Sequence, residues 1–123
     1  YVKLYNSEVS IMNKYEQHGI NYQEAMNRFF QDEDLYVSFL KKFPNDPSYN
    51  ELIHALKKHD FVHAFEAAHK LKGVTGNLSL KTLYSNVCIL VEELRCQNNT
   101  DYDRLMKPIT SSYLKIIDFI HTL

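Results

Sequence analysis

The sequence contains few residues that interrupt helices, and this scarcity constrains the fold. Only three glycines and three prolines occur among 123 residues, and no stretch alternates between apolar and polar residues as strands do. No apolar run approaches the ~20 residues that a membrane-spanning helix requires. A hydrophobic content of 45% is sufficient for one globular core. The chain is therefore predicted to be a single all-α domain over residues 1–123, with no membrane contact.

Net charge and cysteine are also scarce. A formal net charge of −1 and a pI near 6.6 argue against binding to nucleic acid. Cys88 and Cys96 are eight residues apart, about 12 Å along one helix, which is too far for a mutual disulfide. With no visible signal peptide, these features predict a reducing cytoplasm. The chain starts at Tyr1 rather than methionine, so we expect it to be part of a longer protein.

Amphipathic spacing and capping residues predict seven helices. The first is Val2–His18, ended by Gly19, and the second runs from Asn21 to Phe30, where Asn21 and Glu24 form a capping box. The third is Glu33–Phe43, capped by Asp32 and ended by Pro44, and the fourth runs from Asp46-Pro47 to His59. The fifth is capped by Asp60 and ends at Asn77, the sixth is Leu80–Gln97, capped by Ser79, and the seventh is Thr100–Thr122, started by Thr100 with Asp103 and kinked at Pro108. The long helices are predicted to form an antiparallel up-down four-helix bundle, and the short N-terminal helices cover one end.

The predicted helix between Asp60 and Asn77 has two unlike faces. At 100° per residue its apolar side chains share one arc, which would face a core: Phe61, Ala64, Ala67, Ala68, Leu71, Val74, Thr75 and Leu78. His69, Lys72, Gly73 and Gly76 share the opposite side. A glycine inside a helix costs roughly 1 kcal/mol relative to alanine. We therefore expect the two glycines to have a function, namely to let another macromolecule approach His69 closely.

This strip carries a resemblance to a known family. Ala68-His69-Lys70-Leu71-Lys72-Gly73, followed by Gly76 and Asn77, resembles the signature of histidine-containing phosphotransfer (HPt) domains of two-component phosphorelays. The resemblance extends from about Gly19 to Gln97, includes Gly19-Ile20-Asn21 and Arg28-Phe29, and leaves out residues 1–18. It implies that His69 accepts a phosphoryl group from one receiver-domain aspartate and passes it to another.

The resemblance also implies roles for neighbouring residues and partners. Lys72 would stabilise charge on the phosphoryl oxygens, and Gly73 and Gly76 would give access. The expected docking surface comprises Val62, Phe65, Glu66, Met26, Phe29 and Phe30. The expected partners are response-regulator receiver domains and a hybrid sensor histidine kinase, and the chain itself is expected to be a monomer. Mg²⁺ is expected in the receiver, whereas this chain, with no nucleotide-binding motif, is expected to hold no cofactor and to have no kinase activity.

Several residues have a second interpretation. Gly73 and Gly76 could instead allow a neighbouring helix to pack closely, and Asn77 is equally well a C-terminal cap. Lys70 and Lys81 are most simply solvated charges. Several family members have a glutamine or glutamate facing the histidine from the next helix, where this chain has Val91, so Glu92 replaces it or the hydrogen bond is missing.

Two other classes of function are also compatible with parts of the sequence. Glu51-x-x-His54 and Glu66-x-x-His69 have the spacing of di-metal carboxylate oxidases, and His59 and His63 add a further pair. Against this, Glu66 and His69 face away from the apolar arc, whereas such ligands point into a bundle core. A helical adaptor without chemistry at His69 is the third hypothesis, and it leaves the two helical glycines unexplained.

Overall fold

The computed structural model describes residues 2–97 and 100–123, and this part of the chain is helical, without strands. Among the described helices, none combines the length and the hydrophobicity that a bilayer span requires. In chain order the elements are α1 (Val2–Glu16), α2 (Tyr22–Arg28), α3 (Glu33–Leu40), the 3₁₀ turn η1 (Phe43–Asn45), α4 (Ser48–Lys57), α5 (Phe61–Asn77), α6 (Lys81–Arg95) and α7 (Tyr102–Ile120).

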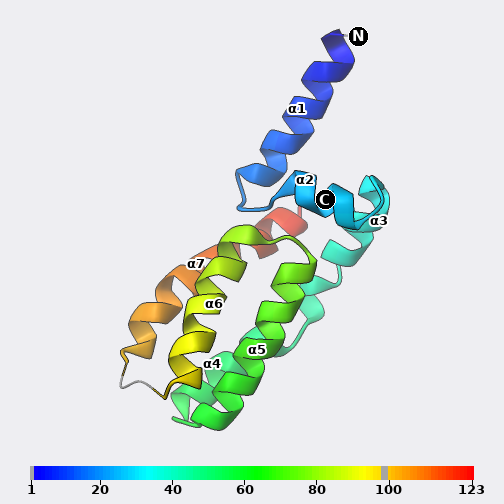
Figure 1. The fold of residues 1–123 in the computed structure, drawn as a ribbon. Coiled ribbons are helices and arrows are strands. Elements are labelled where there is room, and N and C mark those ends of the chain that lie inside the picture. Colours follow the sequence, from blue (N-terminus) through cyan, green and yellow to red (C-terminus); the bar gives the residue numbers. More distant parts are fainter. Residues whose placement is uncertain (1, 98–99) are drawn as a thin grey trace.

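The four helices from α4 to α7 form the body of the molecule, and α1 projects from one end of it (Figure 1). Helix α5 packs against α4 and α6, and α6 packs against α7. Side chains also join α4 to α7, because the Tyr49 and Tyr113 rings stack at 3.7 Å and the Tyr49 hydroxyl donates to Thr110 Oγ1 at 3.0 Å. Helices α2 and α3 lie at the end from which α1 projects.

The core is built from one face of each body helix. Helix α5 contributes mainly small side chains, and α6 and α7 contribute larger aliphatic and aromatic ones. Small residues allow helix axes to approach closely, so α5 can lie between two neighbours. The buried residues of α5 are Ala64, Ala67, Ala68, Leu71 and Thr75, all within the apolar arc predicted from the sequence. Phe61, predicted in the same arc, is instead 44% exposed, because it lies in the first turn of α5.

Short-range capping signals are confirmed at several helix ends. The side chains of Asn21, Asp32 and Asp60 each accept a hydrogen bond from the backbone N–H three residues ahead. Asp46 accepts the N–H of Ser48, and the intervening Pro47 already has helical dihedral angles. The sequence therefore located these four starts within a residue.

Two predicted caps are wrong. Ser79 does not cap α6: it adopts a left-handed conformation (φ 58°), and its hydroxyl donates to Glu24 Oε1. Thr100 does not cap α7, because Asp101 accepts the N–H of Arg104 while the Thr100 hydroxyl donates to Glu93 Oε2. In both cases a carboxylate provides the hydroxyl with a stronger, charge-assisted partner than a cap would; Glu24 is 55 residues from Ser79, and Glu93 is seven residues from Thr100.

Several helices are also shorter than predicted. Helix α1 stops at Glu16, α2 at Arg28, α3 at Leu40, α4 at Lys57, α6 at Arg95 and α7 at Ile120. After three of these ends, a non-glycine residue adopts a left-handed conformation: Phe30, His59 and Gln97. Such residues reverse the chain as a C-terminal glycine would, and residue type alone did not reveal them. Pro108 lies inside α7 on its exposed side.

The turn between α5 and α6 is fastened to the N-terminal segment. The backbone N–H of Asn21 donates to Ser79 O at 3.0 Å, and the N–H of Thr82 donates to Gly19 O at 3.1 Å. The buried Tyr36 hydroxyl donates to Leu78 O at 2.6 Å. These three bonds cross between segments far apart in sequence, so they fix the end of the α5–α6 hairpin against α2 and α3.

We predict that Gly19→Ala destabilises the protein by about 1–3 kcal/mol. Gly19 has φ 79°, and an added Cβ would lie 2.7 Å from Thr82 Oγ1. Gly73→Ala is the matched control: Gly73 is helical with open space around its Cβ position, so this variant should gain about 0.5–1 kcal/mol. Urea unfolding followed by circular dichroism measures both changes, and equal effects of the two substitutions would contradict the prediction.

Candidate functional site

His69 lies on the exposed side of α5, near the middle of this 17-residue helix. Its neighbour Ala68 and residue Leu71 are fully buried, so the backbone that carries the imidazole is anchored by the core. A side chain on a packed helix is held more precisely than one on a loop. The predicted exposure of His69 on a rigid element is therefore confirmed.

The two helical glycines on this side have different surroundings. A Cβ at Gly73 would meet no atom within 4 Å, so the backbone one turn after His69 is open. A Cβ at Gly76 would lie 3.0 Å from Cε1 of Tyr84, which projects from α6. The close-packing interpretation thus fits Gly76, which makes room for Tyr84, and the access interpretation fits Gly73.

Lys72 lies one turn after His69 and is half-buried. No carboxylate pairs with Lys72 among the described residues, so its ammonium is available to an external anion. Lys70 is exposed and is likewise unpaired within the described ranges. An exposed imidazole with ammonium groups nearby can act as a nucleophile toward an electron-poor phosphorus and can attract its oxygens.

Arg95 belongs to the site, and the sequence did not predict it. Its guanidinium lies 5.3 Å from the centre of the Phe65 ring, and that ring lies 5.9 Å from the His69 ring. Phe65, Glu66, His69, Lys70 and Arg95 together line a shallow hollow. Besides the lysine ammonium groups, Arg95 brings a guanidinium, which can contact an oxyanion through two N–H groups at once. Arg95 Nε also pairs with Glu92 Oε1 at 3.3 Å.

The register of the α5–α6 hairpin was the signal that could have located Arg95. Gly76 lies against Tyr84, and Phe65 lies against Arg95. In an antiparallel pair one step forward on α5 corresponds to one step back on α6, so Val91 is opposite His69. This is the offset assigned from the family resemblance. Counting four residues further along α6 would have placed Arg95 beside Phe65.

In the described part of the chain, neither Val91 nor Glu92 forms a hydrogen bond with the His69 ring. Val91 is fully buried, and Glu92 is exposed and paired with Arg95. No hydrogen bond involves the His69 ring within residues 2–97 and 100–123. The ring is therefore oriented by its helix and by the neighbouring Phe65 ring rather than by a polar partner.

The predicted docking residues divide into buried and exposed groups. Met26 is buried in the core, which makes it unsuitable for direct contact with a partner. Phe29 is half-buried and packs against the Tyr36 and Phe39 rings. By contrast Val62 is 70% exposed and Phe30 is 85% exposed. Phe30 also has φ 59°, an uncommon conformation for a bulky residue.

The other histidines do not assemble around His69. His63 Nδ1 contacts Asp60 Oδ2 at 2.5 Å, and His59 packs edge-on against Phe61. In the part of the chain that the structure describes, no three histidine, cysteine, aspartate or glutamate side chains are grouped as metal ligands. Glu66 and His69 are both exposed, as the two faces of the helix predicted. This orientation differs from the inward-pointing ligands of di-metal bundles.

Comparison with protein families, curated proteins and solved structures finds no match for this chain.

We predict that Asp60→Asn lowers the pKa of His63. The Asp60 carboxylate accepts a hydrogen bond from the imidazole and raises its pKa, with a smaller contribution from Glu66. The carboxylate therefore stabilises the fold below the ordinary histidine pKa near 6.5, and this contribution is lost as the pH rises through the raised value. Asparagine can still cap α5 through its Oδ1, so the variant keeps the cap and removes both the charge and the oxygen that accepts from His63 Nδ1. NMR titration measures the change, and an unaltered His63 pKa in the variant would contradict the assignment.

Proposed function

We propose that this chain is a phosphoryl carrier of the HPt type, in which His69 accepts a phosphoryl group from a receiver aspartate and passes it to another. The observation that carries the proposal is the open backbone at Gly73 next to an exposed imidazole on a packed helix. The unpaired Lys72 one turn away supports it. Phosphoryl transfer depends mainly on positioning and on charge stabilisation, and these features supply both.

The proposed fold is an antiparallel four-helix bundle made of α4, α5, α6 and α7. The packing of each helix against the next supports this arrangement, as do the side-chain contacts between α4 and α7. Helices α2 and α3 would then cover one end, and α1 would lie outside the bundle (Figure 1). A bundle of this kind places His69 on the outer side of one helix, where another domain can reach it.

In the proposed reaction, the unprotonated ring nitrogen of His69 attacks the phosphorus of an aspartyl phosphate. The N–P bond forms, the acyl O–P bond breaks, and the receiver aspartate leaves as a carboxylate. The other ring nitrogen retains its proton, so no general base is required. A carboxylate of a second receiver then attacks the phosphohistidine and restores the imidazole. Lys72 attracts the phosphoryl oxygens in both steps.

The proposed partners are response-regulator receiver domains, which would bring their own Mg²⁺ and carboxylates. A hybrid sensor histidine kinase is the proposed source of phosphoryl groups for the first receiver. The carrier would act in the cytoplasm as a monomer and would hold no nucleotide. A di-metal oxidase is a weaker hypothesis, because Glu66 and His69 point away from the core. A helical adaptor is also weaker, because it gives the open backbone at Gly73 no function.

The first test is transfer to His69 itself. Each phosphorylated receiver domain of the source cell is mixed with the protein, and the label on the protein is followed. We expect acid-labile, alkali-stable label on the wild type and none on His69→Gln, because glutamine has no nucleophilic ring nitrogen. His63→Gln is the control and should be labelled normally. Label that persists in His69→Gln, or a wild type that no receiver labels, would contradict the proposal.

The second test concerns access at Gly73. Gly73→Gln should leave the fold intact, because no atom lies within 4 Å of the new Cβ, yet slow transfer about tenfold or more by obstructing approach. Ser111→Gln, at an exposed position on α7, is the matched control and should have no effect. Transfer rates under single-turnover conditions make the comparison. Normal exchange by Gly73→Gln would show that the open backbone has no part in docking.

A further inference from the structure

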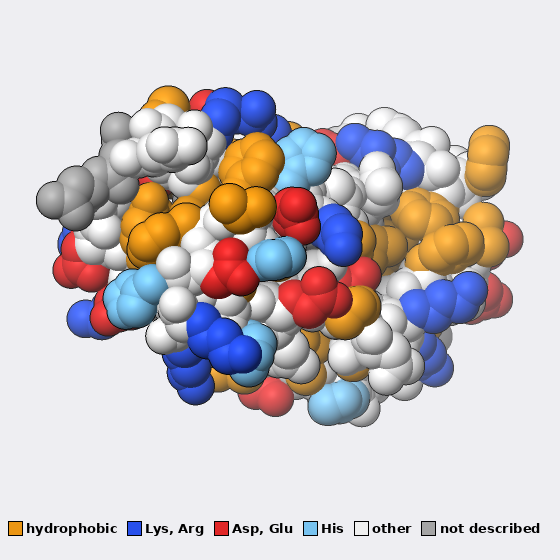
Figure 2. Space-filling model, turned by 90° about the horizontal axis from the view of Figure 1, so that it is seen from below, with side chains coloured by type: hydrophobic (Ala, Val, Ile, Leu, Met, Phe, Trp, Pro, Cys, Tyr) orange, Lys and Arg blue, Asp and Glu red, His pale blue; other side chains and the backbone are white. Residues whose placement is uncertain are grey.

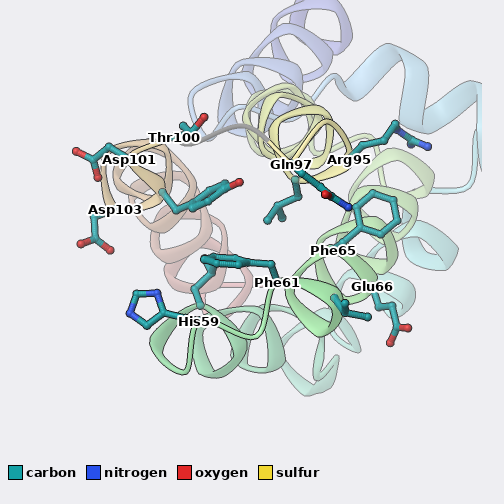
Figure 3. Close-up of a pocket in the computed structure, with 13 residues that line it drawn as sticks. His59, Phe61, Phe65, Glu66, Arg95, Gln97, Thr100, Asp101 and Asp103 are labelled. Carbon is teal, nitrogen blue, oxygen red and sulfur yellow. The ribbon is translucent and has the colours of Figure 1, made fainter.

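A wide cleft lies at the end of the body opposite α2 and α3, between the start of α5, the end of α6 and the start of α7 (Figure 3). Its volume is about 1110 Å³. This is at or above the upper end of the range typical of small-molecule pockets, about 300–1,000 Å³, and the cleft is open to solvent. It is therefore better suited to side chains of another protein than to a small ligand.

The walls of the cleft combine apolar and polar side chains, and the apolar ones include three aromatic rings. Phe61 lies near its centre (Figure 3), and its ring contacts the Tyr102 ring, with 5.3 Å between the ring centres. Phe61 is 44% exposed and Val62 is 70% exposed, although both are large apolar residues. Leu56, Phe65 and Leu94 complete the apolar lining. A concave aromatic surface of this kind can hold an apolar side chain of a partner as a buried anchor.

The rim of the cleft is acidic. Glu66, Asp101 and Asp103 are all exposed, and the two aspartates lie together on one side (Figure 3). Of the described residues that line the cleft, Arg95 is the only lysine or arginine, against three carboxylates. Seen from this end, acidic and histidine side chains adjoin hydrophobic ones (Figure 2). Charge complementarity thus favours a partner with basic side chains here.

The cleft is continuous with the hollow at His69. Phe65, Glu66 and Arg95 line both. An anchor seated in the cleft would thus be separated from the imidazole by only one layer of side chains. A protein that reaches His69 could contact the cleft within the same interface.

We propose that the receiver domain that docks on His69 also inserts an apolar side chain, flanked by lysine or arginine, into this cleft. The proposal rests on the proposed function and adds a direction to it: the footprint of the receiver extends from His69 toward the start of α5. The apolar anchor contributes affinity, and the basic neighbours, attracted by the acidic rim, orient the receiver so that its aspartate faces the imidazole.

The test measures binding separately from transfer. Each purified receiver domain of the source cell is titrated calorimetrically into wild type, Val62→Glu, Asp103→Asn and His69→Gln. Val62→Glu puts a carboxylate where the apolar anchor would pack, and burying that charge against an apolar side chain should cost more than the added attraction for basic residues contributes. In the first turn of α5 a carboxylate suits the helix dipole, so the fold should be retained. We expect about tenfold weaker receiver binding in Val62→Glu, about threefold in Asp103→Asn, and little change in His69→Gln. Circular dichroism verifies folding of each variant.

Leu114→Glu is the matched control, because Leu114 is 53% exposed on α7 and lines neither hollow. It should bind the receiver as the wild type does. Wild-type affinity in Val62→Glu, equal weakening in Leu114→Glu, or no binding of any receiver would overturn the proposal. Binding that is sensitive to Val62→Glu without phosphoryl transfer to His69 would instead overturn the proposed function and retain the cleft as a docking site.

Discussion

The burial of one face of α5 is the interaction on which the other features depend. Ala64, Ala67 and Ala68 present little volume toward the core, so α4 and α6 can both pack against this helix. Leu71 fills the remaining space, and burying such a side chain contributes about 1.5–3 kcal/mol. Because the buried arc is fixed, the opposite side of α5 faces solvent. The exposure of His69 and Gly73 follows from packing on the far side of the helix.

The attachment of the N-terminal segment gives this hairpin a fixed end. Backbone bonds from Asn21 and Thr82 and the bond from the buried Tyr36 hydroxyl converge on the turn after α5. An unsatisfied buried hydroxyl or backbone group would cost about 1–3 kcal/mol, so each of these bonds strongly favours one arrangement of the turn. Gly76 and Tyr84 lie close to this turn, where a side chain at Gly76 would press on the ring. Of the two helical glycines, Gly76 therefore serves the packing of α5 against α6, whereas Gly73 is open to solvent.

The site contains several groups with unlike properties along one helix. The imidazole and Lys72 can engage a phosphoryl group, whereas Val62 and Phe61 near the start of the helix can engage apolar side chains. A transient signalling contact requires both, because a small reactive centre alone provides little affinity. The acidic rim is a local concentration of negative charge on a chain whose net charge is only −1. The proposed docking direction follows from the order of these groups along α5.

The sequence by itself determined the helical class, the two faces of α5, and the helix starts at Asn21, Asp32 and Asp60. These features depend on periodicity or on hydrogen bonds that span three residues, so residue type and spacing are sufficient to predict them. The HPt resemblance and the roles it implies remain proposals.

Only the tertiary structure decided which neighbour each side chain meets. It gave Gly73 and Gly76 different surroundings, and it paired the Ser79 and Thr100 hydroxyls with the carboxylates of Glu24 and Glu93. It also buried Met26 while exposing Phe30. It also brought Arg95 to Phe65 and formed the cleft beside Tyr102. These contacts depend on the rotation and register of each helix relative to the helices packed against it. Packing of the whole core sets both, and no local pattern specifies them.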